Sequence, residues 1–166
     1  SNMTNSMEPY RVLFVCWGNI CRSPGAECVF RSLVEKEALS DRIHCDSAGT
    51  IDQHHGNSPD GRMREAAGRR GIAMEGGARM ATPADFERFD LMLTMDHYNL
   101  SELRSIAPDA ERAKKIRPFC EYLTEHEDLE VPDPYYGGSR GFDIVLDLLE
   151  DGCGNLLASI REQLDI

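Results

Sequence analysis

Residues 11–24 carry the sequence Arg11-Val-Leu-Phe-Val-Cys-Trp-Gly-Asn-Ile-Cys-Arg-Ser-Pro24. Its first five residues are mostly β-branched or aromatic, which favours a strand. Apolar residues at helical spacing follow Pro24 and predict a helix to about Lys36, with Ser23 as N-cap. A loop between a strand and a helix N-terminus can bind a phosphate-like anion, because that terminus presents unpaired N–H groups and a partial positive charge.

The same loop holds a thiol and a guanidinium. Cys16 stands at its start, where the field that attracts an anion also stabilises a thiolate. Arg22 offers a planar fork of donors that can hold two oxygens of the same anion. The loop therefore predicts a site that binds a phosphate and attacks it.

Length and composition fit one domain. A chain of 166 residues buries roughly 70% of the surface that its unfolded form exposes. Residues 1–8 are expected to be a tag remnant and disordered N-terminus, and residues 9–166 a single domain. The sequence has no signal peptide and no run approaching the ~20 apolar residues of a membrane span, so we expect a cytoplasmic protein.

Charge and cysteine spacing narrow the partners. Eighteen basic and 29 acidic residues give a net charge of −11, which disfavours nucleic acid and anionic lipid and leaves a phosphate ester as the better partner. The six cysteines form no C-x-x-C motif, and we expect them to be reduced. We expect no structural metal, and His54 and His55 are interpreted as a solvated pair.

Strand and helix patterns alternate along the rest of the chain. Strands are predicted at 43–48, 90–95 and, weakly, 114–117. Helices are predicted from a Ser58-Pro59-Asp60 start to Gly71, after an Asp96 cap, and from 142 to 164, and a capping-box variant at 82–85 predicts a short turn. This alternation predicts a three-layer α/β fold with a central four-stranded parallel sheet, flavodoxin-like or Rossmann-like. Ligands bind such sheets at the carboxyl ends of the strands, where the Cys16 loop falls.

Two distant motifs resemble one family. Val15-Cys-Trp-Gly-Asn-Ile-Cys-Arg-Ser-Pro24 resembles the signature of the low-molecular-weight protein tyrosine phosphatases, and Val131-Pro-Asp-Pro-Tyr-Tyr-Gly137 is similar to their general-acid loop. The resemblance extends to Asp46-Ser-Ala-Gly-Thr50 and to Thr94-Met-Asp96 with Asn99, in the order of the family. The first motif alone also occurs in arsenate-reducing proteins, so the second makes the resemblance specific.

The resemblance implies hydrolysis of phosphotyrosine and small aryl phosphates through a cysteinyl-phosphate. Cys16 would attack phosphorus, and Arg22 with the loop backbone would hold the phosphoryl oxygens. Asp133 would protonate the leaving group and then activate water. The implied partner is a phosphotyrosine-containing protein or a small aryl phosphate. No cofactor is implied, and we expect a monomer or weak dimer.

Other residues are implied to bind substrate or support the loop. Those implied to bind substrate or phosphate are Trp17, Gly18, Asn19, Ile20, Cys21, Ser23, Asn99, Tyr135 and Tyr136, with Ser47 in a supporting role. Asn19 would brace the loop, and Ser23 would either donate to the Cys16 thiolate or serve only as an N-cap. Cys21 is either inert packing or the partner of Cys16 in a reversible disulfide, which would make the site redox-sensitive. Gln53 is implied to line the cleft.

Two alternatives remain open. An arsenate reductase of the same fold would share the first cysteine, but its thioredoxin-coupled chemistry needs further cysteines near 83–99, where this chain has none. A non-catalytic phosphoprotein-binding module would bind tightly without turnover.

Overall fold

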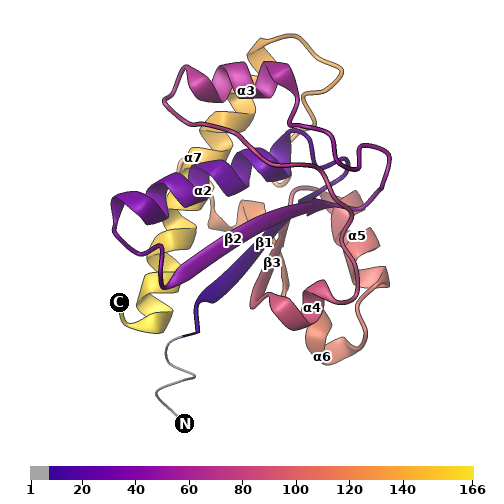
Figure 1. Ribbon diagram of the computed structural model, residues 1–166, viewed down its shortest axis with the longest axis vertical. Helices are drawn as coiled ribbons and strands as arrows, with labels where there is room; N and C mark the ends of the chain where they lie inside the picture. The colour runs from indigo at the N-terminus through magenta and orange to yellow at the C-terminus, as the bar shows by residue number, and fades with distance from the viewer. Residues whose placement is uncertain (1–7) are drawn as a thin grey trace.

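The computed structural model describes residues 8–166 and has a four-stranded parallel sheet at its centre (Figure 1). The strands, in the spatial order β2-β1-β3-β4, are β1 (Tyr10–Cys16), β2 (Ile43–Gly49), β3 (Leu91–Thr94) and β4 (Ile116–Pro118). Cys16 pairs with Gly49, and Val15 pairs with Thr94, so the carboxyl ends of β1, β2 and β3 lie side by side. The predicted α/β class is confirmed. Except for residue 8, the expected tag remnant lies outside the described residues.

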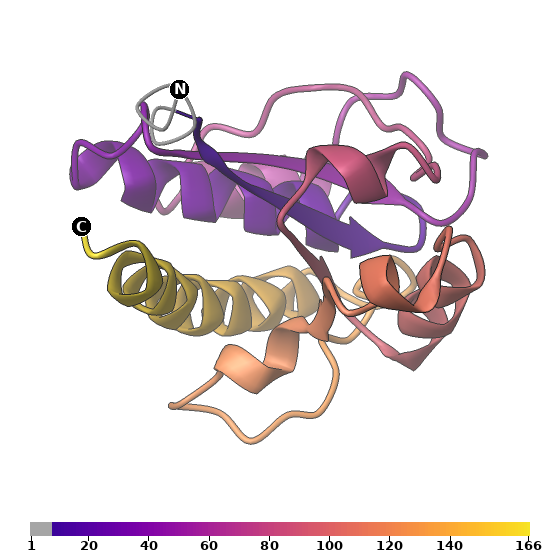
Figure 2. The same ribbon diagram turned by 90° about the horizontal axis from the view of Figure 1, so that it is seen from below.

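Alternate residues of β1 enter two separate cores. Val12 and Phe14 face a core formed with α2 (Arg22–Lys36), α3 (Gly61–Gly68) and α7 (Arg140–Leu164). Leu13 and Val15 face a second core with α4 (Asp85–Arg88) and α5 (His97–Ser105). Figures 1 and 2 show α2 and α7 side by side on one face of the sheet. Along residues 8–166 no helix is both long and apolar enough to cross a membrane.

Two predicted helix starts are wrong. Helix α2 begins at Arg22 after an N-cap at Cys21, so Ser23 is not the N-cap and its hydroxyl is directed to other partners. Helix α3 is capped by Asp60, whose carboxylate accepts the Arg62 and Met63 N–H groups, and not by Ser58. Both corrections have one cause. The residue that occupies a helix N-cap depends on the path of the preceding loop, which the local sequence does not specify.

Other boundaries differ from the prediction more mildly. Strand β4 begins at Ile116, two residues later than the predicted strand at 114–117. Helix α3 ends at Gly68, before the turn at Gly71 where its end was predicted. The short α6 (Ala110–Ala113) and the 3-10 helix η1 (Phe119–Tyr122) were not predicted. The Asp96 cap is confirmed, and Asn99 completes it as a capping box. These short pieces have too few residues for a periodic signal.

Asp151 fastens the polar segment after η1 to α7. Its side chain is 4% exposed and accepts hydrogen bonds from the Thr124 and Glu125 N–H groups, and it contacts His126 Nδ1 at 2.9 Å. The hydrogen bond to Asp151 raises the pKa of His126 above its ordinary value of 6.5. This carboxylate therefore anchors the chain that leads into the 131–137 loop.

The His126–Asp151 pair should make thermal stability depend on pH. Because the pKa of His126 is raised by folding, its stabilising contribution is present below about pH 6.5 and is lost as the pH rises through the folded-state value. We expect Tm to fall between about pH 5.5 and 8.5 more in the protein than in His126→Gln. Thermal unfolding at both pH values measures this. The control His55→Gln should behave as the parent does, since His55 and its neighbour Asp52 are both exposed.

Candidate active site

The loop after β1 turns its amides inward because its carbonyls are held from outside. The Trp17 carbonyl accepts the Thr50 and Ile51 N–H groups, and the Ile20 carbonyl accepts the Asp60 N–H at 2.8 Å. Within residues 8–166, five loop amides donate to no protein acceptor: those of Trp17, Gly18, Ile20, Cys21 and Arg22. A curved loop of such amides before a helix forms an anion-binding concavity.

Gly49 lets β2 approach this loop. A Cβ built on Gly49 would stand 2.7 Å from the Trp17 carbonyl oxygen and 3.1 Å from the Asn19 nitrogen, both backbone atoms. Since backbone cannot move aside as a side chain can, a larger residue would push the loop away from the sheet.

Cys16 lies at the bottom of the concavity. Its side chain is 2% exposed, and its Sγ accepts the Asn19 N–H at 3.3 Å and lies 3.0 Å from Ser23 Oγ. The Asn19 N–H is thus directed at the sulfur, and the Ser23 hydroxyl, which also lies 3.2 Å from the Ala48 carbonyl oxygen, is close enough to donate to it. The structure thus supports the interpretation of Ser23 as a thiolate donor over that of an N-cap.

Asn19 braces the loop from within. Its backbone is in the left-handed region, at φ 57°, which asparagine tolerates better than most residues. Its amide donates to Ser23 Oγ at 2.8 Å and Ser47 Oγ at 3.0 Å, and its Oδ1 accepts the Arg79 N–H at 2.9 Å. Ser47 in turn donates to Glu27 Oε1. The supporting positions predicted for Asn19 and Ser47 correspond to this network, which joins β2, α2 and the loop.

Arg22 is buried under the pocket, 3% exposed, with its guanidinium held by fixed acceptors. It donates to Asp96 Oδ2 at 2.7 Å and to the Val131 carbonyl at 2.9 Å, and it lies 3.7 Å from Asp133 Oδ2. Burial alone would lower the pKa of Arg22, but the Cys16 charge and the Asp96 hydrogen bond raise it, so the cation persists. The fork is therefore oriented before any ligand arrives.

Asp133 comes from a distant loop to the mouth of the same hollow. Its Oδ1 accepts the Tyr135 N–H at 3.0 Å, while the side chain remains 36% exposed. The hollow has a volume of about 80 Å³ and is lined by Cys16, Trp17, Gly18, Ile20, Cys21, Arg22, Gln53, His54, Asp133, Tyr135 and Tyr136. Residues of the predicted site that are more than a hundred positions apart in the chain thus meet in one narrow pocket, although Asn19, Ser23, Ser47 and Asn99 do not line it.

An aromatic wall stands beside Asp133. The Tyr135 and Tyr136 rings meet edge to face with centroids 4.9 Å apart. The Arg62 guanidinium lies 5.3 Å from the centre of the Tyr135 ring and 4.8 Å from that of Phe142, within the range of cation–π attraction. Arg62 also forms an ion pair with Asp60, whose backbone N–H donates to the Ile20 carbonyl. Arg62 therefore links the aromatic wall to the anion loop.

Asn99 is not placed as predicted. It is 1% exposed and does not line the pocket. Its Oδ1 accepts the Met95 and Asp96 N–H groups, and its amide donates to Asp96 Oδ1. The Asn99 side chain therefore orients Asp96, the ion-pair partner of Arg22. Asn99 is thus linked to the pocket through Asp96 and Arg22 and does not line it.

Four residues near the site were missed or misread from sequence. His54 lines the pocket, half-buried, and its ring would contact a Cβ on Gly18 at 3.0 Å, so the solvated-pair interpretation holds only for the exposed His55. Asp96 was expected only as a cap, and Asp60 and Arg62 carried no site prediction. Asp96 alone had a usable signal, the D-x-x-N capping box.

All six cysteines are free thiols. Burial and the nearby Asp60 raise the pKa of the Cys21 thiol. Cys28 and Cys153 are buried, as expected of small core residues, whereas Cys45 and Cys120 are only half-buried. Across residues 8–166, no group of three or more His, Cys, Asp or Glu side chains is arranged to hold a metal ion.

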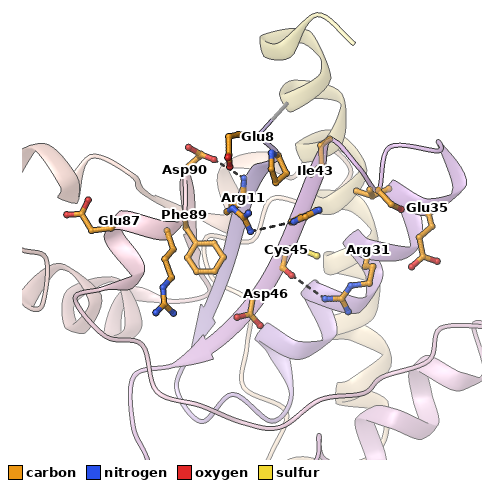
Figure 3. A pocket seen from close by; sticks show the side chains of 15 residues that line it. Glu8, Arg11, Arg31, Glu35, Ile43, Cys45, Asp46, Glu87, Phe89 and Asp90 are labelled. Carbon is orange, nitrogen blue, oxygen red and sulfur yellow. Dashed lines mark hydrogen bonds between the residues drawn. The ribbon is translucent and has the colours of Figure 1, made fainter. Parts of the chain in front are cut away.

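A larger hollow, of about 860 Å³, lies at the other end of the sheet. Figure 3 shows its charged side chains interacting within the wall: the Arg11 N–H donates to Asp90, the Arg11 guanidinium lies 3.5 Å from His44, and Arg31 donates to the Cys45 carbonyl. It opens at the amino ends of the strands, away from the Cys16 loop at their carboxyl ends. Chemistry is therefore better supported at the smaller pocket.

The fold and the pocket define a class: an α/β protein with a Cys-x5-Arg anion loop after its first strand. The family model for low molecular weight phosphotyrosine protein phosphatase matches residues 11–165. The chain belongs to this family.

Relatives agree with this assignment. The low molecular weight phosphotyrosine protein phosphatase of Schizosaccharomyces pombe is 45% identical over 95% of this chain and 99% of that protein. The low molecular weight protein-tyrosine-phosphatase of Streptomyces coelicolor is 42% identical over 94% and 96%. A crystal structure of a protein tyrosine phosphatase from Entamoeba histolytica superposes with a TM-score of 0.90 at 41% identity, covering 93% of this chain and 98% of that one.

Proposed function

We propose that the protein hydrolyses phosphotyrosine and small aryl phosphates through a cysteinyl-phosphate intermediate. One observation carries the proposal: Cys16 Sγ, five free loop amides and the Arg22 guanidinium surround a pocket with the Asp133 carboxylate at its mouth. The family of the chain supports the same activity.

In the first step, the Cys16 thiolate attacks phosphorus and the bond to the ester oxygen breaks. The Asn19 N–H and the Ser23 hydroxyl stabilise the thiolate before attack. The loop amides and Arg22 bind the equatorial phosphoryl oxygens as charge shifts onto them, which is where such donors accelerate the reaction most. Asp133, in its protonated form, gives its proton to the leaving phenolate.

In the second step, water hydrolyses the cysteinyl-phosphate. Asp133, now a carboxylate, removes a proton from that water, which attacks phosphorus and releases inorganic phosphate with the Cys16 thiolate. Trp17, Ile20, Tyr135 and Tyr136 surround the substrate ring in this proposal, and Gly18 leaves room above the loop. The narrow pocket, about 80 Å³, suits a flat aryl group.

Assaying phosphate release from a phosphotyrosine peptide tests the proposal. We expect turnover of this peptide and of p-nitrophenyl phosphate, and trapping of a phosphorylated Cys16 after acid quench. A phosphoserine peptide should be turned over far more slowly, because its short side chain cannot carry phosphorus to the bottom of the pocket. Absence of aryl phosphate turnover would contradict the proposal.

The same assay addresses the alternatives. Thiol-dependent arsenate reduction that exceeds aryl phosphate turnover would favour the reductase, and tight phosphopeptide binding without release would favour a binding module. Neither is supported by an observation of its own.

Three further properties belong to this proposal. We propose that the protein works in the cytoplasm, as a monomer or weak dimer. We also propose that Cys21 forms a reversible disulfide with Cys16 under oxidation, protecting the nucleophile from sulfinic acid formation.

Replacing Arg62 should loosen the aromatic wall. We expect Arg62→Ala to lower kcat/KM for a phosphotyrosine peptide about two- to fivefold, because cation–π contacts to Tyr135 and Phe142 are lost. The matched control is Arg64→Ala, an exposed arginine of the same helix. Steady-state kinetics measure both variants, and equal values would show that Arg62 does not position the wall.

A further inference from the structure

A second hollow adjoins the catalytic pocket. It has a volume of about 470 Å³ and shares Trp17, Arg22 and Asp133 with the pocket. We call it the α5 groove, and its remaining wall residues are Asp96, Tyr98, Glu102, Glu130, Val131 and Pro132. Because the two hollows share three residues, a peptide with its phosphotyrosine in the pocket would lay neighbouring residues along this groove.

The α5 groove is negatively charged. Four carboxylates line it: Asp96, Glu102, Glu130 and Asp133. Its one cationic wall residue, Arg22, is 3% exposed and already bound to Asp96. Among residues 8–166, Glu102 makes no ion pair, so its charge is available to a ligand. An anionic partner would be repelled here, whereas a cation would be attracted.

Two exposed aromatic rings complete the groove. Trp17 is 37% exposed and Tyr98 is 78% exposed, although aromatic side chains of this size are usually more buried. Tyr98 and Glu102 are four residues apart on α5, so they lie on one helix face. Aromatic faces next to carboxylates bind guanidinium and ammonium groups by cation–π attraction together with ion pairing.

We propose that the α5 groove binds an Arg or Lys residue that neighbours the phosphotyrosine in the protein substrate. This inference rests on the proposed phosphatase function and adds to it a substrate class, phosphotyrosine in a basic sequence. Charge complementarity and the shared walls of the two hollows carry it. The net charge of −11 favours approach of the same basic partners.

Kinetics with two synthetic peptides test the inference. Both carry one phosphotyrosine, flanked on each side by Arg in the first and by Glu in the second. We expect kcat/KM to be about five- to tenfold higher for the Arg peptide at low salt. The ratio should fall at about 0.5 M salt, because exposed charges are screened.

Variants then locate the preference. Tyr98→Ala and Glu102→Lys should each bring the ratio towards one while leaving p-nitrophenyl phosphate turnover unchanged, since neither residue contacts the pocket. Glu35→Lys makes the same change in net charge at the far end of α2 and should keep the preference. Equal rates for the two peptides, or a preference that survives Tyr98→Ala and Glu102→Lys, would overturn the role of the groove. If neither peptide nor p-nitrophenyl phosphate is turned over, the proposed function itself fails.

Discussion

Cys16→Ser is expected to lose turnover of p-nitrophenyl phosphate by about 10⁴-fold or more. The replacement keeps a hydrogen-bonding atom between Asn19 and Ser23, so the loop should fold as before. A serine hydroxyl, however, is not ionised by the two donors that stabilise a thiolate, and it forms no cysteinyl-phosphate. Steady-state kinetics with p-nitrophenyl phosphate measure the loss.

Binding and stability separate a chemical defect from a folding defect. Cys16→Ser should still bind inorganic phosphate in calorimetry, because the loop amides and Arg22 are unchanged. Cys120→Ser replaces a half-buried thiol elsewhere in the chain and should retain full turnover. Appreciable activity in Cys16→Ser with a normal Tm would rule out the cysteinyl-phosphate mechanism.

Asp133→Ala is expected to slow phosphorylation of the enzyme by a phosphotyrosine peptide by about 10²- to 10⁴-fold. The loss in the rate of enzyme phosphorylation should be much smaller for p-nitrophenyl phosphate, because nitrophenolate leaves without a proton whereas the phenolate of tyrosine needs one. Dephosphorylation of the intermediate should also slow, so the phosphorylated enzyme should accumulate with the better leaving group. Rapid-quench kinetics with both substrates measure each step.

The control for Asp133→Ala is Asp128→Ala, an exposed acid in the preceding segment. Asp128→Ala should leave the turnover of both substrates unchanged. Asp133 also faces Arg22 at 3.7 Å, so phosphate affinity is measured alongside the rates. An equal loss in the rate of enzyme phosphorylation with both substrates would show that Asp133 acts through Arg22 and not as an acid.

The strand, loop and helix at 10–36 were predictable because each part has its own local cause. Apolar β-branched residues favour β1, and apolar residues at helical spacing favour α2. The fold class followed from the repeated alternation of such segments. Ser23 shows the limit of local reasoning. A serine before a proline is a good N-cap by composition, but the hydroxyl of Ser23 lies 3.0 Å from the sulfur of Cys16, seven residues earlier.

Asn99 and His54 show the same limit within the site. The sequence near Asn99 predicts a helix start, which is correct, but whether its amide faces a ligand or its own capping partner depends on how β3 delivers Asp96 to Arg22. His54 stands in a stretch without periodicity, so nothing local indicates that it packs beside Gly18. Contacts between segments decide both positions.

Propensity, periodicity and motif spacing are local properties of a chain, and they were enough to predict the fold class, the anion loop and the candidate chemical groups. The packed structure was needed to show which groups surround Arg22, which residues line the pocket, and that an acidic, aromatic groove continues from it. Those features depend on contacts between residues more than a hundred positions apart, such as Arg22 with Val131 and with Asp133, and such contacts form only when the sheet and helices pack.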